Sequence, residues 1–352
     1  MKSLIEVPKT MKALVLHEVG KLTLDEVPVE EIRPGTVLVK IKACGICSSD
    51  VERVFINGTY HFPTIPGHEF SGQIVAVGDD VDESLLGGRT CVFPMLPCFE
   101  CPSCQKKQYA QCSHYDYFGS RRDGGYAEYL VVPTWNLVLF DDDLSYDVAA
   151  MCEPAAVGIH ANGLANVQKG QKVLVIGTGM IGYVCAAFAS QITDQVIMCG
   201  NSAAKLELAK KYGWETIALE TDNFEERINE LTDGEGVDVV MEVVGTNAAI
   251  CNAVTAAGPN STIVLVGNPK ADLTMEKNLY WKILRKSITL RGSWNSSYND
   301  EQNDWKTALE RLKGGEFDQL ITHRFPMEES EEAFRVMRDR NTFSTKVMFV
   351  MD

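Results

Sequence analysis

The sequence predicts an α/β protein built from two domains, and three features of the chain support this prediction. Up to about residue 155 the chain is rich in Gly and Pro, and short β-branched runs such as 36–41 and 73–77 indicate a β domain with long loops. From residue 172 onward, strand-like runs alternate with amphipathic helical segments, which is typical of a parallel, doubly wound sheet. A last strand-like run at 345–350 is able to return to the first domain.

The second half alternates regularly between the two kinds of element. Strands are expected at 173–176, 195–199, 237–242 and 262–266, and helices at 180–190, 203–212, 224–231 and 248–256. The uncharged stretch 173–193 has the length of a membrane helix, but three glycines and two threonines interrupt it. A buried strand, a turn and a helix therefore fit this stretch better.

Size and charge exclude several classes of protein. With 352 residues, of which 45% are hydrophobic and 23% charged, the chain can bury two cores, which excludes a disordered protein, a collagen and a small disulfide scaffold. The net charge of -15 repels nucleic-acid phosphates and anionic lipid, so neither nucleic acid nor a membrane is an expected partner. Glu6 and Lys9 interrupt the apolar run that a secretion signal needs, so a cytoplasmic protein is expected.

The cysteines are concentrated in the first domain. Seven of the eleven precede residue 113, and an odd total in a long chain indicates metal binding or catalysis rather than disulfides. In the lobe at 95–115, the close spacing lets four thiolates face one Zn²⁺ ion: Cys98, Cys101, Cys104 and Cys112. Because four thiolates leave no position for a substrate, a structural zinc site is expected, with an iron–sulfur cluster or four incidental cysteines as the alternatives.

A glycine motif, G-T-G-M-I-G at 177–182, follows a strand and opens a helix. Such a turn lets a dinucleotide pyrophosphate approach the backbone at the helix N-terminus. The next strand ends without the carboxylate that binds the ribose of NAD, and Lys205 is close by, so NAD and NADP both remain possible. The expected cofactor-binding residues are Gly177, Thr178, Gly179, Met180, Ile181, Gly182, Gly200, Asn201, Ser202 and Lys205.

A third set of residues is scattered along the chain. It consists of Cys47, His68, Glu69 and Glu153, which supply one thiolate, one imidazole and two carboxylates. This donor set suits a catalytic zinc ion with an open position. None of the separations is local, so packed core residues are the alternative interpretation.

Taken in order, five motifs resemble the zinc-dependent medium-chain dehydrogenases. They are G-I-C-S-S-D at 45–50, G-H-E-F-S-G at 67–72, the four cysteines, C-E-P-A-A-V-G at 152–158 and the glycine motif. The resemblance runs from Met11 onward and implies a GroES-like β-barrel catalytic domain (1–157), a Rossmann domain (158–294) and a segment that returns to the catalytic domain (295–352). Residues 1–10 precede the usual family start and are expected to be an extension.

The resemblance also implies roles for single residues. Cys47, His68, Glu69 and Glu153 would form the catalytic metal shell, with one glutamate acting through water, for a total of two zinc ions per chain. Ser49 would relay the alcohol proton, and Asp50 would orient the metal-bound histidine. Glu52 stands where some relatives have a relay histidine, which leaves the final proton acceptor unassigned. A shell containing carboxylates is also less selective, so manganese is an alternative to zinc there.

Two carboxylates in the shell resemble the sorbitol-dehydrogenase branch. The segments 96–104, 117–129 and 291–297 are similar to dehydrogenases of galactitol 1-phosphate and of arabitol phosphate. The expected reaction is therefore hydride transfer from a secondary hydroxyl of a sugar-alcohol phosphate to NAD(P), giving a ketose phosphate. A phosphorylated substrate needs local cations, and Arg53, Arg121 and Arg122 are the candidates. Arginines at 121 and 122 that simply pair with neighbouring aspartates are the alternative.

Other functions are compatible with the same motifs. Within enzymes, the substrate could be an unphosphorylated polyol, a 2,3-diol or threonine. A member without activity is disfavoured because the metal and glycine motifs are intact. A nucleic-acid-binding zinc ribbon is disfavoured because no basic stripe accompanies the cysteines. As is common in the family, a homodimer or homotetramer is expected.

Overall fold

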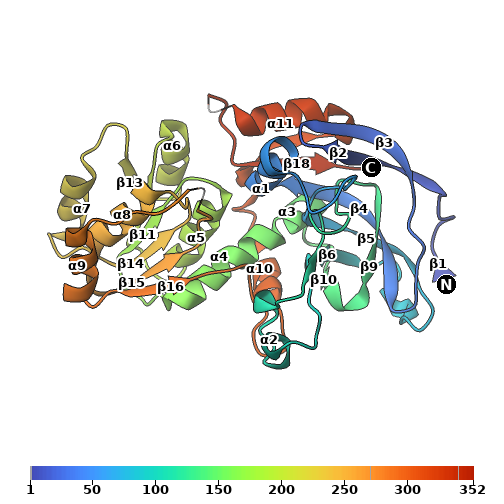
Figure 1. Cartoon of the computed structure of the whole chain (residues 1–352), viewed down its shortest axis with the longest axis horizontal. Helices are drawn as coiled ribbons and strands as arrows, with labels where there is room; N and C mark the ends of the chain where they lie inside the picture. The colour runs from blue at the N-terminus through green and yellow to red at the C-terminus, as the bar shows by residue number, and fades with distance from the viewer. Residues whose placement is uncertain (1, 270, 340) are drawn as a thin grey trace. The chain divides into compact units, whose positions relative to one another are not determined.

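The structure is a computed structural model that describes residues 2–269, 271–339 and 341–352 (Figure 1). These residues form two compact units. Unit 1 comprises the described residues up to Glu153 together with those from Ser297 onward, and unit 2 is Pro154–Ser296. The sequence predicted the boundaries after residues 157 and 294. Helix α4 (Cys152–Ala165) runs through the first boundary without a break.

Unit 1 is a β domain with short helices. Its strands are β1 (Lys2–Ser3), β2 (Thr10–Glu18), β3 (Lys21–Pro28), β4 (Thr36–Ile46), β5 (Glu69–Val77), β6 (Arg89–Val92), β7 (Met95–Leu96), β8 (Asp116–Tyr117), β9 (Tyr129–Pro133), β10 (Leu137–Phe140), β17 (Ile321–Phe325) and β18 (Lys346–Val350). Its helices are α1 (Ser48–Glu52), α2 (Pro102–Gln105), α3 (Tyr146–Ala150), α10 (Asp304–Leu312) and α11 (Ser330–Arg338). Short turns of 3₁₀ or π type are η1 (Arg53–Asn57), η2 (Glu83–Leu85), η3 (Tyr109–Gln111), η4 (Thr134–Asn136), η5 (Asp318–Leu320) and η6 (Met327–Glu329).

Strand β4 is the centre of unit 1. It pairs antiparallel with β5, β9 and β18, and the main path of the sheet is β10-β6-β5-β4-β18-β17. The long run of β-branched and apolar residues in β4 suits a strand that is buried on both faces. Strand β18, the predicted last strand, lies beside β4 and contributes Val347 and Phe349 to the core.

Residues before Met11 also belong to the sheet. Lys2 and Ser3 form β1 and pair with Val77 and Ala76 of β5. Residues 1–10 were expected to be an extension, but Lys2 and Ser3 in this segment cover the edge of the core strand β5.

Unit 2 is a parallel sheet with helices between its strands. The strands are β11 (Val173–Ile176), β12 (Val196–Gly200), β13 (Glu215–Ala218), β14 (Val237–Glu242), β15 (Ala257–Leu265) and β16 (Thr289–Gly292). The helices after α4 are α5 (Met180–Ser190), α6 (Ala203–Lys211), α7 (Phe224–Thr232), α8 (Asn247–Ala256) and α9 (Lys277–Arg285). The sheet order is β13-β12-β11-β14-β15-β16.

The strand order of unit 2 reverses at β11, which has β12 on one side and β14 on the other. Ligands of doubly wound sheets bind beyond the carboxyl ends of the strands at such a point. The glycine motif begins there, directly after Ile176. The α/β class predicted from the sequence is confirmed, and the stretch 173–193 forms β11, the glycine turn and α5. Among the described residues, no helix is long and apolar enough to cross a membrane.

The position of β18 gives a test of the fold. Phe349 is fully buried and its ring packs edge-on against Tyr126, with the ring centres 5.1 Å apart. We expect Phe349→Ala to lower the free energy of unfolding by about 3–5 kcal/mol, because it leaves a cavity in the core. Chemical denaturation measures this loss.

The matched control is Val350→Ala on the same strand, where the side chain is 39% exposed. This change should cost less than about 1 kcal/mol. Equal, small losses in both variants would contradict the placement of Phe349 in the core.

Candidate active site

Three of the four predicted catalytic ligands lie together in unit 1. Cys47 directly precedes α1, His68 directly precedes β5, and Glu69 is the first residue of β5. One ligand atom from each residue lies within 4.8 Å of the others. Gly45 of β4 faces Glu69, and a Cβ atom at this position would be 2.2 Å from the Glu69 carboxylate. The glycine of the G-I-C motif therefore leaves room for a ligand side chain.

Asp50 lies behind this group and is fully buried. Its carboxylate accepts hydrogen bonds from the Cys47 N–H (3.1 Å), the Tyr126 hydroxyl (2.9 Å) and Nη1 of Arg53 (2.9 Å). It also lies 3.2 Å from Nδ1 of His68. Burial opposes ionisation, but His68 and Arg53 hold the pKa of Asp50 well below its usual range. The contact with His68 is an ion-pair distance without hydrogen-bond geometry, because Nδ1 of His68 has no hydrogen-bond partner among the described residues. A charged Asp50 therefore attracts this side of the ring electrostatically and leaves the other nitrogen for a metal.

Glu69 is bound by a residue that the sequence analysis missed. Nζ of Lys346, on β18, donates to its Oε2, and the two side chains are 3% and 2% exposed. Lys346 also donates to the Ile46 carbonyl at 3.4 Å. Burial opposes the charge of Lys346, yet Glu69 keeps its pKa above the ordinary value. A lysine inside an apolar strand-like run was the available signal, but its partner is far away in sequence.

Glu153, the fourth predicted ligand, lies at the start of α4 and is 8% exposed. Its carboxylate does not lie with the three ligand atoms of the described group. Instead it accepts a hydrogen bond from the Tyr117 hydroxyl at 3.4 Å. Burial raises the pKa of Glu153 to about 7; nearby His68 lowers it and Glu69 raises it. Tyr117, whose ring lies 5.8 Å from that of His68, is a further residue that the sequence analysis missed.

The donor set fits zinc. A cysteine sulfur, an imidazole nitrogen and a carboxylate oxygen are ordinary zinc ligands, and three protein ligands leave a position for substrate. Ser49 lies next to this group in the first turn of α1, and its Oγ accepts a hydrogen bond from Arg53 at 2.9 Å.

The two arginines of the glycine-bounded loop have different surroundings. The guanidinium of Arg121 stacks on the rings of Tyr60 and Tyr115, at 4.1 and 4.4 Å from their centres. It donates to the Tyr60 hydroxyl at 3.2 Å, and its buried Nε has no hydrogen-bond partner among the described residues. Arg122 forms a long ion pair with Asp116, at 3.8 Å.

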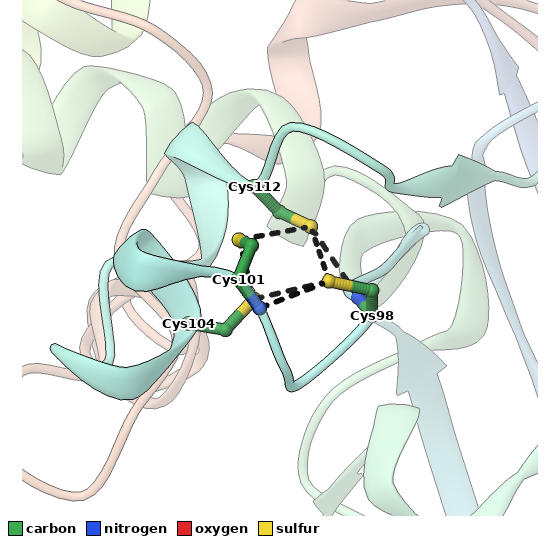
Figure 2. Close-up of side chains that lie close together, drawn as sticks. All are labelled: Cys98, Cys101, Cys104 and Cys112. Atoms are coloured by element: carbon green, nitrogen blue, oxygen red, sulfur yellow. Dashed lines mark hydrogen bonds between the residues drawn. The ribbon is translucent and has the colours of Figure 1, made fainter.

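The four cysteines of the lobe form the second group. Figure 2 shows that the sulfurs of Cys98, Cys101, Cys104 and Cys112 point toward one another. Neighbouring sulfurs are 3.5–4.0 Å apart. Thiolates about 2.3 Å from one zinc ion would lie about 3.8 Å apart at the corners of a tetrahedron, so the arrangement fits one closed site. Hydrogen bonds from the backbone at Cys104 and Ser113 lower the pKa of the Cys101 thiol to about 5, which favours the thiolate.

In unit 2, the predicted cofactor residues surround the carboxyl end of β11. Gly177 has a φ of +123°, and α5 begins at Met180 after Gly179. A Cβ at Gly182 would lie 1.9 Å from the Gly177 carbonyl oxygen, so only glycine lets the helix approach the turn. Thr178 and Met180 are buried, whereas Gly179 lies in open space.

The end of β12 carries the other predicted residues. A Cβ at Gly200 would lie 2.6 Å from the Thr178 methyl carbon. Asn201 is exposed, and Ser202 caps α6 by accepting from the Lys205 N–H at 3.5 Å. Burial lowers the pKa of Lys205. Asn201, Ser202 and Lys205, which the sequence predicts as cofactor-binding residues, thus follow the carboxyl end of β12.

Two family models match the chain. An alcohol dehydrogenase GroES-like domain matches residues 33–142, and a zinc-binding dehydrogenase matches residues 177–314. The chain belongs to the zinc-dependent medium-chain alcohol dehydrogenases. It is an oxidoreductase that acts on a CH–OH group, and zinc and NAD(P) are its cofactors. The predicted GroES-like and Rossmann parts are confirmed.

Individual relatives are similar over nearly their whole length. Galactitol 1-phosphate 5-dehydrogenase of Escherichia coli (strain K12) is 36% identical over 97% of this chain and 100% of its own. A crystal structure of galactitol-1-phosphate dehydrogenase from Escherichia coli matches with a TM-score of 0.91 over the same shares. D-arabitol-phosphate dehydrogenase of Enterococcus avium is 32% identical over 96% and 97% of the two chains. A zinc-binding dehydrogenase from Sinorhizobium meliloti 1021 bound to NADP is 27% identical, with a TM-score of 0.90 over 98% and 100%.

The glycine turn gives a test with two substitutions. Gly182→Ala should destabilise the apoprotein by about 1–3 kcal/mol, because its Cβ collides with the turn. Gly179→Ala should leave the unfolding free energy of the apoprotein nearly unchanged, since nothing lies within 4 Å of its Cβ. It should nevertheless weaken NAD(P) binding by at least about tenfold if the pyrophosphate approaches the backbone here.

Thermal unfolding and calorimetric titration with NAD and NADP measure the two effects. Unchanged cofactor affinity in Gly179→Ala would place the pyrophosphate elsewhere.

Proposed function

We propose that the protein oxidises a secondary hydroxyl of a sugar-alcohol phosphate with NAD or NADP and produces a ketose phosphate. The observation that carries this proposal is the group of Cys47, His68 and Glu69 beside Ser49. The similarity to dehydrogenases of galactitol 1-phosphate and D-arabitol phosphate supports the substrate class.

Cys47, His68 and Glu69 would hold the catalytic zinc ion directly, and Glu153 would act through water. The group of three clustered ligand atoms, which does not include the Glu153 carboxylate, supports both assignments. Zinc, when bound, acts as a Lewis acid that lowers the pKa of the substrate hydroxyl. Asp50 holds the ring of His68, and Lys346 balances the charge of Glu69. Manganese is the alternative metal because two of the three donors are nitrogen and oxygen.

The proton and the hydride leave the substrate by different routes. Oγ of Ser49 accepts the hydroxyl proton and passes its own proton outward. NAD(P), when bound, would supply the acceptor for the hydride that leaves the carbon. The residues of the glycine turn would hold the pyrophosphate, and Asn201, Ser202 and Lys205 would receive a 2′-phosphate of NADP.

Arg121 is the strongest candidate for the substrate phosphate. Its stacking on Tyr60 and Tyr115 fixes the plane of the guanidinium, and the contacts described for Arg121 are with aromatic rings rather than with a carboxylate. Arg122 already faces Asp116, in agreement with the alternative that this arginine simply pairs with an aspartate. An unphosphorylated polyol, a 2,3-diol or threonine is the alternative substrate.

We also propose a cytoplasmic homodimer or homotetramer that binds neither nucleic acid nor membranes. Thiolate clusters persist in a reducing compartment, and the net charge of -15 opposes anionic partners. The edge strand β16 is exposed along its whole length, and such an edge can pair with a second copy.

The substrate proposal is tested by kcat/KM for galactitol 1-phosphate, arabitol phosphate and their dephosphorylated forms, each with NAD and with NADP. We expect a preference of about 100-fold or more for the phosphorylated compounds, which corresponds to about 2.7 kcal/mol. Arg121→Gln should remove most of this preference and leave kcat/KM for the free polyols nearly unchanged, because it removes only a distal charge. Equal activity on both forms in the native protein would overturn the phosphate assignment.

Metal content tests the two zinc sites. The native protein should bind about two zinc ions per chain, and Cys104→Ser should bind about one, because a three-sulfur shell is incomplete. Elemental analysis after dialysis measures both, with Cys251→Ser in unit 2 as the control. Two ions retained in Cys104→Ser would contradict a zinc site held by the four cysteines.

A further inference from the structure

Arg53 connects two parts of the site that the sequence treats separately. It begins η1 directly after α1, and its Nη1 donates to Oγ of Ser49 and to Oδ1 of Asp50, both at 2.9 Å. Asp50 in turn lies 3.2 Å from Nδ1 of His68. One guanidinium nitrogen thus contacts both the predicted relay hydroxyl and the carboxylate that holds the histidine.

Arg53 is itself held firmly. Its side chain is 22% exposed and its partner Asp50 is fully buried. Asp50 is fixed by two further donors, the Cys47 N–H and the Tyr126 hydroxyl. The position of Nη1 is therefore set by a buried network and not by solvent.

We propose that Arg53 is a positioning residue that orients the hydroxyl of Ser49 for proton transfer, and not a ligand of the substrate phosphate. The hydrogen-bonding capacity of the two side chains supports this role. A serine hydroxyl has one O–H and two lone pairs, and an arginine has only donors. Because Arg53 can only donate, its hydrogen bond occupies one lone pair of the Ser49 oxygen. The O–H of Ser49 must therefore point away from Arg53.

The second lone pair and the O–H of Ser49 determine how the proton moves. The free lone pair of Ser49 Oγ accepts the proton that leaves the substrate oxygen. At the same time the original Ser49 proton passes to a solvent water, so no charge remains on the serine. The positive charge of Arg53 disfavours the opposite orientation, in which the Ser49 hydrogen would face the guanidinium.

This inference rests on the proposed reaction but differs from the earlier expectation for Arg53. From the sequence, Arg53 is one of three candidate cations for the substrate phosphate, together with Arg121 and Arg122. A residue that binds the phosphate raises kcat/KM only for phosphorylated substrates. A residue that orients the relay hydroxyl raises kcat for every substrate of the site. The two roles therefore predict different patterns across the same set of compounds.

The experiment compares Arg53→Met and Arg53→Lys with the native enzyme, on a polyol phosphate and its free polyol. We expect Arg53→Met to lower kcat by about 10- to 100-fold on both compounds, with a smaller change in KM. The ratio of kcat/KM between the two compounds should stay within about threefold of the native ratio. Arg53→Lys, which keeps one charged donor, should recover at least about a third of the lost activity on a logarithmic scale.

A second readout does not depend on turnover. Because Arg53 holds Asp50 and Asp50 holds His68, a chelator should remove zinc from the catalytic site of Arg53→Met about tenfold faster than from the native protein. The matched control is Arg335→Met, an arginine of unit 1 whose exposed side chain pairs with Glu332; it should leave the rate of zinc removal and kcat on both compounds unchanged. Thermal unfolding of each variant verifies that the fold is retained, and if Arg53→Met does not fold, Arg53→Gln replaces it.

The outcomes separate the two proposals. Loss confined to the phosphorylated compound would overturn the positioning role and make Arg53 a phosphate ligand. An unchanged kcat would also overturn it. If the native enzyme shows no preference for phosphate, the proposed substrate fails, but an equal loss of kcat in Arg53→Met on the free polyol still supports the role of Arg53.

Discussion

The charge on the buried carboxylate of Asp50 is the constraint on which the catalytic half of this protein depends. A carboxylate with no exposure is stable as an anion only when donors surround it. The chain supplies them from the Cys47 backbone, from Arg53 and from Tyr126, with His68 beside them. These residues come from separate parts of the chain: Cys47 precedes α1, Arg53 begins η1, His68 precedes β5 and Tyr126 precedes β9. The donors that surround this one anion therefore fix the relative positions of the metal ligands and the relay hydroxyl.

The second buried charge, on Glu69, depends on the arrangement of the strands. Strand β4 lies between β5 and β18, and Gly45 at its end leaves the space in which the Glu69 carboxylate lies and Lys346 reaches it. Neither charge of this pair is solvated, so losing one partner would leave the other uncompensated. The antiparallel pairing of β4 with β5 and with β18 thus makes a carboxylate possible at this depth. The parallel sheet of unit 2 serves a different need, since it presents backbone N–H groups at the end of β11.

Local patterns in the sequence predicted the elements and motifs well, because their causes are local. The bounds of β11, α5 and β14 agree with the prediction, since apolar periodicity and a glycine turn determine them. The four cysteines are close in sequence and therefore close in space. By contrast, Lys346, Tyr117 and Tyr126 were not predicted, because strand alternation does not reveal which distant residue a side chain meets. For the same reason the separate surroundings of Arg121 and Arg122 could not be read from their adjacency.

The contact between Lys346 and Glu69 has a consequence for the order in which the protein is made. The two residues are 277 positions apart, and all of unit 2 lies between them in the chain. During synthesis, the ribosome therefore releases Cys47, His68 and Glu69 long before the lysine that balances Glu69 exists. Until then, strand β4 lacks its neighbour β18, and the ligand group carries more negative charge than in the finished protein. Glu69 therefore has no buried cation to balance it until β18 has joined the sheet, and the ligand group described here is complete only after the last strand of the chain is in place.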